Sequence, residues 1–320
     1  MSTAEVEIPN YTGRELRFLA DNYKQAQDLR KSTGEQIRAV VQGRDETFIP
    51  LGEIVVPDDS DPFWLSPANE TFTADELLNE IQYGSTRGPV PMLGRSHHRY
   101  WTEERETYKD MMAALDAHPA WEWLQQVRGI GATLGCKLLA RFDATKAEYA
   151  SSFWAYAGLA TVPAERYRCP ECGLTRAWPV GYNVTGDHKR IGTGKDCTSK
   201  LEKVAGPEQG VRCAQPKPKK GEKATYDQYA KKVCYLVATS FLKAGGPYEQ
   251  YYREERAKAE RTRPGWVKGR KHYLALRKTQ KLFLSHLWQT WRRAIGLPTP
   301  DPWAVAHGGH EGKIEPEEMI

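Results

Sequence analysis

The stretch from Leu124 to Leu139, LQQVRGIGATLGCKLL, limits what this chain can fold into more than any other segment. An apolar pattern of helical period precedes Gly129-Ile130-Gly131 and another follows it, which predicts two helices joined by a tight turn. Glycine accepts positive φ angles without a Cβ clash, so two glycines permit a turn tighter than other residues allow. Ile130 between them is expected to enter the core.

A turn of this kind leaves the first amides of the second helix without backbone partners, and such amides suit a phosphate group. The pattern is therefore typical of a helix-hairpin-helix, a module that holds the nucleic-acid backbone without reading its sequence. The predicted DNA contacts in this turn are Arg128, Gly129, Gly131, Thr133 and Lys137. The alternative is an ordinary turn between helices, with its glycines at a C-terminal cap.

Charge is distributed unevenly along the chain. The segment from Lys217 to Arg293 contains 20 Lys and Arg residues against 6 Asp and Glu, whereas the rest contains 26 against 35. This segregation favours a surface that binds a polyanion, here the DNA backbone, with RNA as an alternative ligand. Solvated helix faces explain a single basic run better than a surplus spread over 77 residues.

The predicted DNA contacts in this basic segment lie near its C-terminal end. They are Lys268, Arg270, Lys271, Arg277, Lys278 and Lys281. Trp266 and His272 lie among these cations, where they either stack on bases or belong to the core.

Apolar periodicity predicts a mainly α protein, and 320 residues leave room for about two domains. The predicted helices span 12–43, 102–117, 146–157, 225–244, 248–261 and 274–295, with a short one beginning at Thr73. Thr225 and Gln228 have the spacing of a capping box. We expect an N-terminal helical region (1–120), the hairpin with the following helix (121–162), a zinc-binding insertion (163–218), basic C-terminal helices (219–297) and a disordered tail (298–320).

The insertion contains four of the six cysteines in the chain. Within it, CPECG at 169–173 is a knuckle whose two thiolates can bind one tetrahedral ion. In a cytosolic protein such a pair indicates a metal more often than a disulfide, and no βαβ pattern supports a redox site. We expect a small zinc-ribbon-like β or loop module, in which His188 could replace either of the last two predicted ligands. The predicted zinc ligands are Cys169, Cys172, Cys197 and Cys213.

The hydropathy of the chain indicates where in the cell the protein is located. No run of about 18 apolar residues occurs, which predicts that no segment spans a membrane. The N-terminal MSTAEVEIPNYTGREL is acidic and lacks an apolar signal segment, so a cytoplasmic location is expected.

Three blocks of the chain, taken in order, resemble a known family. VRGIGATLGCKLLARFD, followed by FWAYAGLATVP, is similar to the C-terminal domain of insertion-sequence-one-ten transposases. The later segments beginning KGEKATYDQYAKK and RPGWVKGRKHYLALRK resemble the helical end of that domain in its divergent, partly phage-borne members. The resemblance covers about 124–163 and 221–297, and it implies a helical domain that binds DNA during transposition.

The chain departs from this family in the parts that cut DNA. Family members begin with a RuvC-like domain that carries four acidic metal ligands, whereas residues 1–120 here predict helices and loops, so two-metal chemistry has no evident place. The family also uses a serine nucleophile soon after the AYAGL block. The nearest candidates here are Thr185 and Ser199, without His or Asp partners at a suitable spacing. Catalytic residues therefore stay unassigned.

The sequence leaves three hypotheses for the function. The first is a DNA-binding protein that holds the backbone through the hairpin and the basic helices. The second is an active transposase or recombinase, with a diverged nucleophile or with a nuclease domain supplied by a partner. The third is a protein-interaction scaffold stapled by zinc. Homo-oligomerisation through the long N-terminal helix stays open in all three.

Overall fold

The structure is a computed structural model that describes residues 13–41 and 91–320, except 183, 185, 191, 192, 217, 219, 220, 222 and 302–311. Eight α-helices and a few short strands make up the described part, so the predicted mainly α fold class is confirmed. The chain divides into two compact units, one ending at His118 and the other extending from Pro119 onward. The short helix predicted at Thr73 lies outside the described residues.

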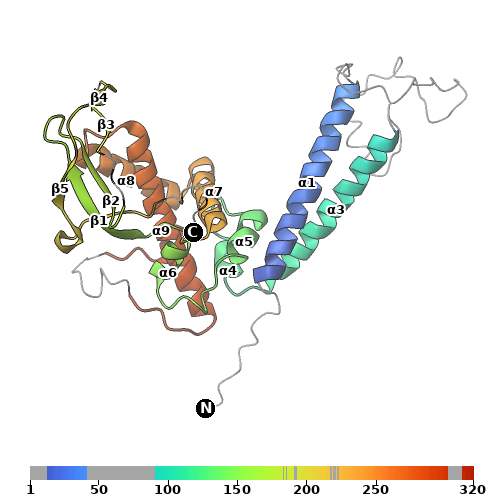
Figure 1. Ribbon diagram of the computed structural model, residues 1–320. Helices are drawn as coiled ribbons and strands as arrows, with labels where there is room; N and C mark the ends of the chain where they lie inside the picture. Colours follow the sequence, from blue (N-terminus) through green and yellow to red (C-terminus); the bar gives the residue numbers. More distant parts are fainter. Residues whose placement is uncertain are drawn as a thin grey trace, which may run out of the picture. The chain divides into compact units, whose positions relative to one another are not determined.

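The first unit is an antiparallel pair of helices, α1 (Gly13–Val41) and α3 (Pro91–Asp116), which lie side by side (Figure 1). Tyr23 packs on Tyr108 with ring centroids 5.8 Å apart, and Thr33 Oγ1 lies 3.2 Å from His97 Nδ1. The start predicted at Thr102 is wrong, because α3 begins eleven residues earlier. Its first turns continue the packing on α1 through the buried His97, and this tertiary contact extends the helix beyond the predicted start.

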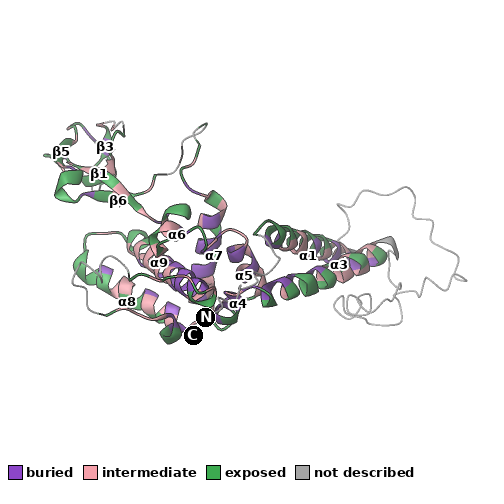
Figure 2. Cartoon of the chain, turned by 90° about the horizontal axis from the view of Figure 1, so that it is seen from below, coloured by how far each residue is buried: buried purple, intermediate pink, exposed green. Residues whose placement is uncertain are grey.

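The second unit has a helical body whose centre is α9. Its helices are α4 (Trp121–Leu124), α5 (Ala132–Leu139), α6 (Ala150–Tyr156), α7 (Gln228–Ala244), α8 (Pro247–Thr262) and α9 (Lys268–Ala294). Figure 2 shows buried residues concentrated along α7 and α9. Phe241 stacks on Tyr248 with centroids 4.6 Å apart, and Phe283 meets Phe241 edge-on at 5.3 Å. This aromatic cluster joins α7, α8 and α9.

Two helix starts in this body differ from the sequence prediction. The capping box at Thr225 is wrong, because α7 is capped by Asp227, whose Oδ1 accepts a hydrogen bond from the Ala230 amide at 2.7 Å. The basic helix α9 begins at Lys268, six residues before its predicted start. Polar residues dominate that first turn, so apolar periodicity could not locate it.

The turn before α5 is tight, but only one of its two glycines requires a left-handed conformation. Gly129 has φ +97°, whereas Gly131 is extended with φ −102° and precedes α5 as its N-terminal cap. Ser240 Oγ donates a hydrogen bond to the Gly129 carbonyl at 2.6 Å, so the turn packs against α7. Ile130 is buried as predicted, with 7% of its surface exposed.

Residues 161–214 form a small antiparallel module. Its strands are β1 (Thr161–Arg168), β2 (Thr175–Pro179), β3 (His188–Lys189), β4 (Asp196–Cys197), β5 (Glu202–Ala205) and β6 (Arg212–Ala214). The start of β1 pairs with β6, and its later residues pair with β2 on one side and β5 on the other. The strands β3 and β4 form a separate hairpin.

Polar side chains of α9 hold the segments that lead into this module. The Arg277 guanidinium donates to the Leu159 carbonyl at 2.7 Å, just after α6. The Trp288 indole and the Arg292 guanidinium donate to the Ala147 carbonyl at 2.7 and 3.0 Å. Buried carbonyl groups outside regular structure need such donors, so α9 fixes the path of the chain from α5 to β1.

The prediction of a disordered tail is wrong for residues 312–320. The 3₁₀ turn η2 (Pro316–Met319) docks on the helical body, and Met319 has only 5% of its surface exposed. The Trp123 indole donates to the Pro316 carbonyl at 3.3 Å, and Arg293 forms ion pairs with Glu315 and Glu317. Burial of Met319 and the ion pairs of Arg293 therefore hold this polar segment against the helical body. Residues 302–311 lie outside the described part.

None of the helices that the structure describes is long and apolar enough to span a lipid bilayer.

The first prediction concerns the packing of α5 on α4. A Cβ at Gly135 would lie 2.3 Å from Cζ3 of the buried Trp121, so Gly135→Ala forces the ring to move. We expect the free energy of unfolding to fall by about 1–3 kcal/mol, as for other overpacked cores. The matched control is Gly269→Ala in the first turn of α9, where a Cβ meets no atom within 4 Å. Its expected effect is a gain of up to about 1 kcal/mol. Equal effects in urea denaturation would contradict this account.

The second prediction concerns His286, which links the tail to the core. Its Nε2 lies 3.0 Å from the Ile314 carbonyl, which only accepts, so Nε2 carries the proton and Nδ1 accepts from the Tyr248 hydroxyl at 2.8 Å. Burial lowers the pKa of His286 to about 4, against a weaker opposing effect of the Ile314 carbonyl and of Glu315 and Glu317.

Because the pKa is lowered on folding, the stability that neutral His286 contributes is complete above about pH 6.5 and is lost as the pH falls towards 4. We expect the free energy of unfolding to drop by up to about 3 kcal/mol over that range. The difference between the wild type and His286→Gln in urea denaturation isolates this contribution. A difference that does not vary with pH would show that the imidazole is not the titrating group.

Candidate metal centre and basic surface

Cys169 and Cys172 lie in the turn between β1 and β2. Gly173, with φ +69°, reverses the chain, and the Cys169 amide donates to the Leu174 carbonyl at 2.8 Å. The Cys172 amide donates to Cys169 Sγ at 3.3 Å. The knuckle predicted from the sequence therefore points both sulfur atoms to the same side of the turn.

The β3–β4 hairpin supplies the other two members of the cluster. His188 and Cys197 are directly opposite each other in the register of this hairpin. Side chains opposite each other in an antiparallel pair lie on the same face, with Cβ atoms about 5 Å apart. The hairpin thus brings together two residues that are nine positions apart in the sequence.

The ligand atoms of these four side chains lie close enough together to share one metal ion. Their ligand atoms all lie within 4.8 Å of one another, with Cys169 Sγ 3.8 Å from Cys197 Sγ and Cys172 Sγ 3.3 Å from His188 Nε2. Two thiolates that are each about 2.3 Å from one ion are separated by about 3.8 Å. His188 Nδ1 faces the Gly186 carbonyl at 3.0 Å, which leaves Nε2 for the ion. The cluster is compatible with a metal such as zinc.

The prediction of Cys213 as a ligand is wrong, and His188 takes its place. Cys213 lies on β6 opposite Val162, near the start of β1, whereas the cluster lies beyond the other end of that strand. Seven residues of extended strand separate Val162 from Cys169, or about 23 Å. His188 was the alternative left open by the sequence. Glycines occur between His188 and Cys197 in the sequence and are typical of a hairpin turn. This signal could have favoured His188 as the fourth ligand.

Neighbouring polar groups make the thiols of the cluster differ. Burial raises the pKa of Cys169, but hydrogen bonds from the Cys172 amide and other groups, including the Ser199 hydroxyl, outweigh burial and lower that pKa to about 6. Burial raises the pKa of Cys197 to about 11. Ser199, one of the two nucleophile candidates, therefore supports the cluster. Thr185, the other, lies outside the described residues.

The predicted DNA contacts in the hairpin turn differ in their accessibility. Arg128 and Gly131 are exposed, whereas Thr133 and Lys137 are half-buried. Gly129 faces α7, and a Cβ there would lie 3.2 Å from that of Ala244. Gly129, the glycine with positive φ, therefore packs against α7. The exposed surface of the turn comes from the residues beside it, Arg128 and Gly131.

Three of the six cations predicted on α9 have partners outside α9 and the segment just before it. Arg277 holds the Leu159 and Ala160 carbonyls, Lys278 pairs with Glu255, and Lys281 lies over the Trp154 ring at 4.4 Å.

The other three lie in or near the first turn of α9. Lys268 is exposed, Lys271 donates to the Pro264 carbonyl at 3.4 Å, and Arg270 stacks on Trp266 at 3.7 Å. Arg263 also lies over the Trp266 ring, at 4.4 Å, and Trp266 is half-buried, so it contacts two cations and is not a core residue.

Cations from the module and from α9 gather along one face of that helix. Arg277 and Lys281 follow Arg270 by seven and eleven residues, which places the three side chains within about 40° of one another around the helix. We call the group to which they belong the basic seam. It comprises Arg176, Arg212, Arg263, Arg270, Arg277 and Lys281. Sequence reasoning did not assign Arg176, Arg212 or Arg263 as contacts, because they come together only in the tertiary structure.

The cations of the basic seam lie close together although their charges repel one another. Burial lowers the pKa of Lys281, and the charges of Arg277 and Arg212 lower it further. Burial, then Arg263 and Arg176, act in the same way on Arg270. The groups that shift these two pKa values are other cations, and no carboxylate is among them.

No protein-family model matches this chain, and no curated protein sequence matches it. The resemblance to transposases therefore stays a prediction that rests on three sequence blocks.

The third prediction tests the membership of the metal cluster. We expect one metal ion per chain in the wild type and in Cys213→Ser, but little or none in His188→Ala and Cys172→Ser, because each of the latter removes a ligand. Elemental analysis of the purified proteins measures this. Metal retained by His188→Ala, or lost from Cys213→Ser, would restore the ligand set expected from the sequence.

Proposed function

We propose that this protein binds DNA through the phosphate backbone, and that a structural zinc ion shapes the module which completes the binding surface. The observation that carries the proposal is the basic seam. Side chains of β2, β6, the segment before α9 and α9 itself converge there, although the convergence opposes folding electrostatically. A polyanion that neutralised the seam would relieve that repulsion and release its own counterions.

The chemistry of the seam suits phosphate. Arginine presents a planar fork of donors to phosphate oxygens, and five of the six residues in the seam are arginines. Arg176, Arg212, Arg263 and Arg270 are exposed, so their outer faces are accessible to a ligand. Trp266 orients Arg263 and Arg270 by cation–π contact, which lowers the entropy that each would lose on binding.

The assignment of zinc follows from the donor set. Three thiolates and one imidazole in tetrahedral arrangement are ligands that Zn²⁺ takes in structural sites. Cys169, Cys172, His188 and Cys197 would fill all four positions and leave none for a reacting water. The ion would therefore supply folding free energy, and it would tie the β1–β2 turn, close to Arg176, to the β3–β4 hairpin.

The hairpin turn provides a second candidate contact. Gly131 is exposed at the N-terminal cap of α5, and the exposed Arg128 precedes the turn by one residue. We propose that this turn acts as a helix-hairpin-helix, with the first amides of α5 holding a phosphate. Its contribution adds to that of the seam.

The fourth prediction concerns salt dependence. If about six phosphates are neutralised, affinity for a DNA duplex falls by about 10³ between roughly 50 and 200 mM salt. In Arg176→Gln/Arg263→Gln, two phosphate contacts are lost, so the slope of log affinity against log salt becomes shallower by about 1.8. Fluorescence anisotropy of labelled DNA measures both slopes.

The matched control is Arg17→Gln/Lys109→Gln, which makes the same change in net charge at exposed positions of the other unit. Its slope is expected to equal that of the wild type. DNA affinity that does not change with salt concentration would contradict the proposal. Affinity for an acidic polypeptide equal to that for DNA would favour the protein-interaction scaffold.

A further inference from the structure

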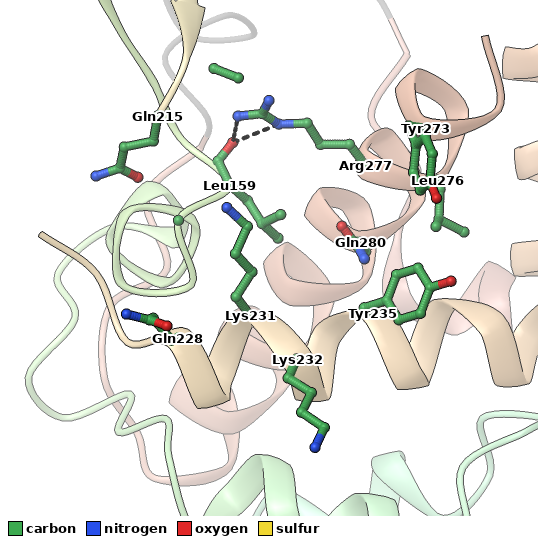
Figure 3. Close-up of a pocket in the computed structure, with 12 residues that line it drawn as sticks. Leu159, Gln215, Gln228, Lys231, Lys232, Tyr235, Tyr273, Leu276, Arg277 and Gln280 are labelled. Atoms are coloured by element: carbon green, nitrogen blue, oxygen red, sulfur yellow. Dashed lines mark hydrogen bonds between the residues drawn. The ribbon is translucent and has the colours of Figure 1, made fainter. Parts of the chain in front are cut away.

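A groove of about 690 Å³ opens between α7 and α9. The segments that enter and leave the β module, at Leu159 and at Gln215, form its other walls (Figure 3). Figure 3 places Gln215 at one end, Tyr235 and Tyr273 at the other, and Arg277 and Gln280 between them. The volume of the groove is within the range of small-molecule sites.

Two side-chain amides at this groove have unused hydrogen-bonding capacity. Gln280 has only 7% of its surface exposed, and its side-chain amide makes no hydrogen bond to any residue that the structure describes. Gln215 Oε1 is buried without a partner, although the Nε2 of the same side chain donates to Thr225 Oγ1 at 3.3 Å. Buried polar groups are nearly always paired in folded proteins, so the unpaired Gln215 Oε1, with the Gln280 amide beside the same groove, points to a polar ligand.

Aromatic surface lines the opposite end. Tyr235 on α7 and Tyr273 on α9 have 42% and 61% of their surfaces exposed, and Leu276 lies between the helices beside them. Exposed tyrosine rings next to a cavity offer flat apolar faces on which a nucleobase can stack.

The charge of the groove is positive. Arg277 belongs both to its lining and to the basic seam, and Lys231 and Lys232 come from α7. Lys231 Nζ lies over the Tyr226 ring at 4.4 Å, which restrains its position at the wall. Among the described residues that line the groove there is no carboxylate. A ligand that combines an anion with a flat polar ring matches this arrangement.

We propose that the groove holds one unpaired nucleotide of the DNA that the basic seam binds, with its base against the two tyrosines and its phosphate towards Lys231 and Arg277. The inference rests on the proposed DNA binding. Gln280 would bind the edge of the base. The glutamine amide offers a donor and an acceptor side by side, and this pair matches N7 and the exocyclic amine of adenine. An unpaired adenine is therefore the best fit.

The test compares two duplexes of the same length and sequence, one fully paired and one with a single bulged adenine. We expect the wild type to bind the bulged duplex about tenfold or more tightly, which is the effect of one additional base–aromatic stack. Tyr235→Leu and Gln280→Leu are each expected to abolish this preference. Both keep the affinity for the paired duplex and its salt slope, because neither removes a charge.

Tyr149→Leu is the matched control, since Tyr149 is half exposed and does not line the groove. It is expected to keep the preference for the bulge. Thermal unfolding of each variant verifies its fold, and Tyr235→Leu tests the groove at an exposed position if Gln280→Leu proves unstable.

The outcomes separate this inference from the proposed function. Salt-dependent binding that is equal for the two duplexes would overturn the nucleotide groove and leave DNA binding intact. Salt-independent binding, or no binding to either duplex, would overturn both. Adenosine monophosphate that competes at the same concentration as the bulged duplex would assign the groove to a free nucleotide and overturn the proposal of a polymer-borne one.

Discussion

The donors that α9 directs at backbone carbonyl groups hold the second unit together. Arg277, Trp288 and Arg292 bind the carbonyls of Leu159 and Ala147, which lie in the segments on either side of α6. Without these donors, buried carbonyls in irregular segments would lose hydrogen bonds that water supplies in the unfolded chain, at a cost of about 1–3 kcal/mol each. The same helix therefore positions the module, the groove and half of the basic seam.

Arg277 shows how one cation serves both folding and the candidate surface. Its Nε and Nη2 donate to the Leu159 and Ala160 carbonyls, yet no carboxylate in the described part of the chain forms an ion pair with it. Burial lowers the pKa of this guanidinium, but an arginine stays protonated at physiological pH. A positive charge is thereby held at the junction between the helices and the module, where seam and groove meet. Rigid placement of this kind favours binding because less side-chain entropy is lost.

Local sequence patterns predicted the CPECG knuckle and most of the helices. They failed where contacts between residues distant in the sequence determine the structure. Cys169 and Cys172 are close in sequence, so their spacing alone predicts their convergence. Cys213 was wrongly included because its distance from the knuckle depends on pairing with the start of β1. The start of α3 was missed because His97 packs on α1, and residues 312–320 were expected to be disordered although Met319 docks on the core.

The sequence by itself determined the helical class, the tight turn at Gly129, a cysteine-rich module without α-helices and a strongly basic segment at 217–293. These follow from periodicity, glycine stereochemistry and composition, which act over a few residues or over the whole chain. Only the tertiary structure decided that His188 completes the metal cluster and that Arg176 and Arg212 join the cations of α9. It also decided that Gln280 faces a groove. Those outcomes depend on strand register and helix packing, which bring distant residues together and leave no periodic signal in the sequence.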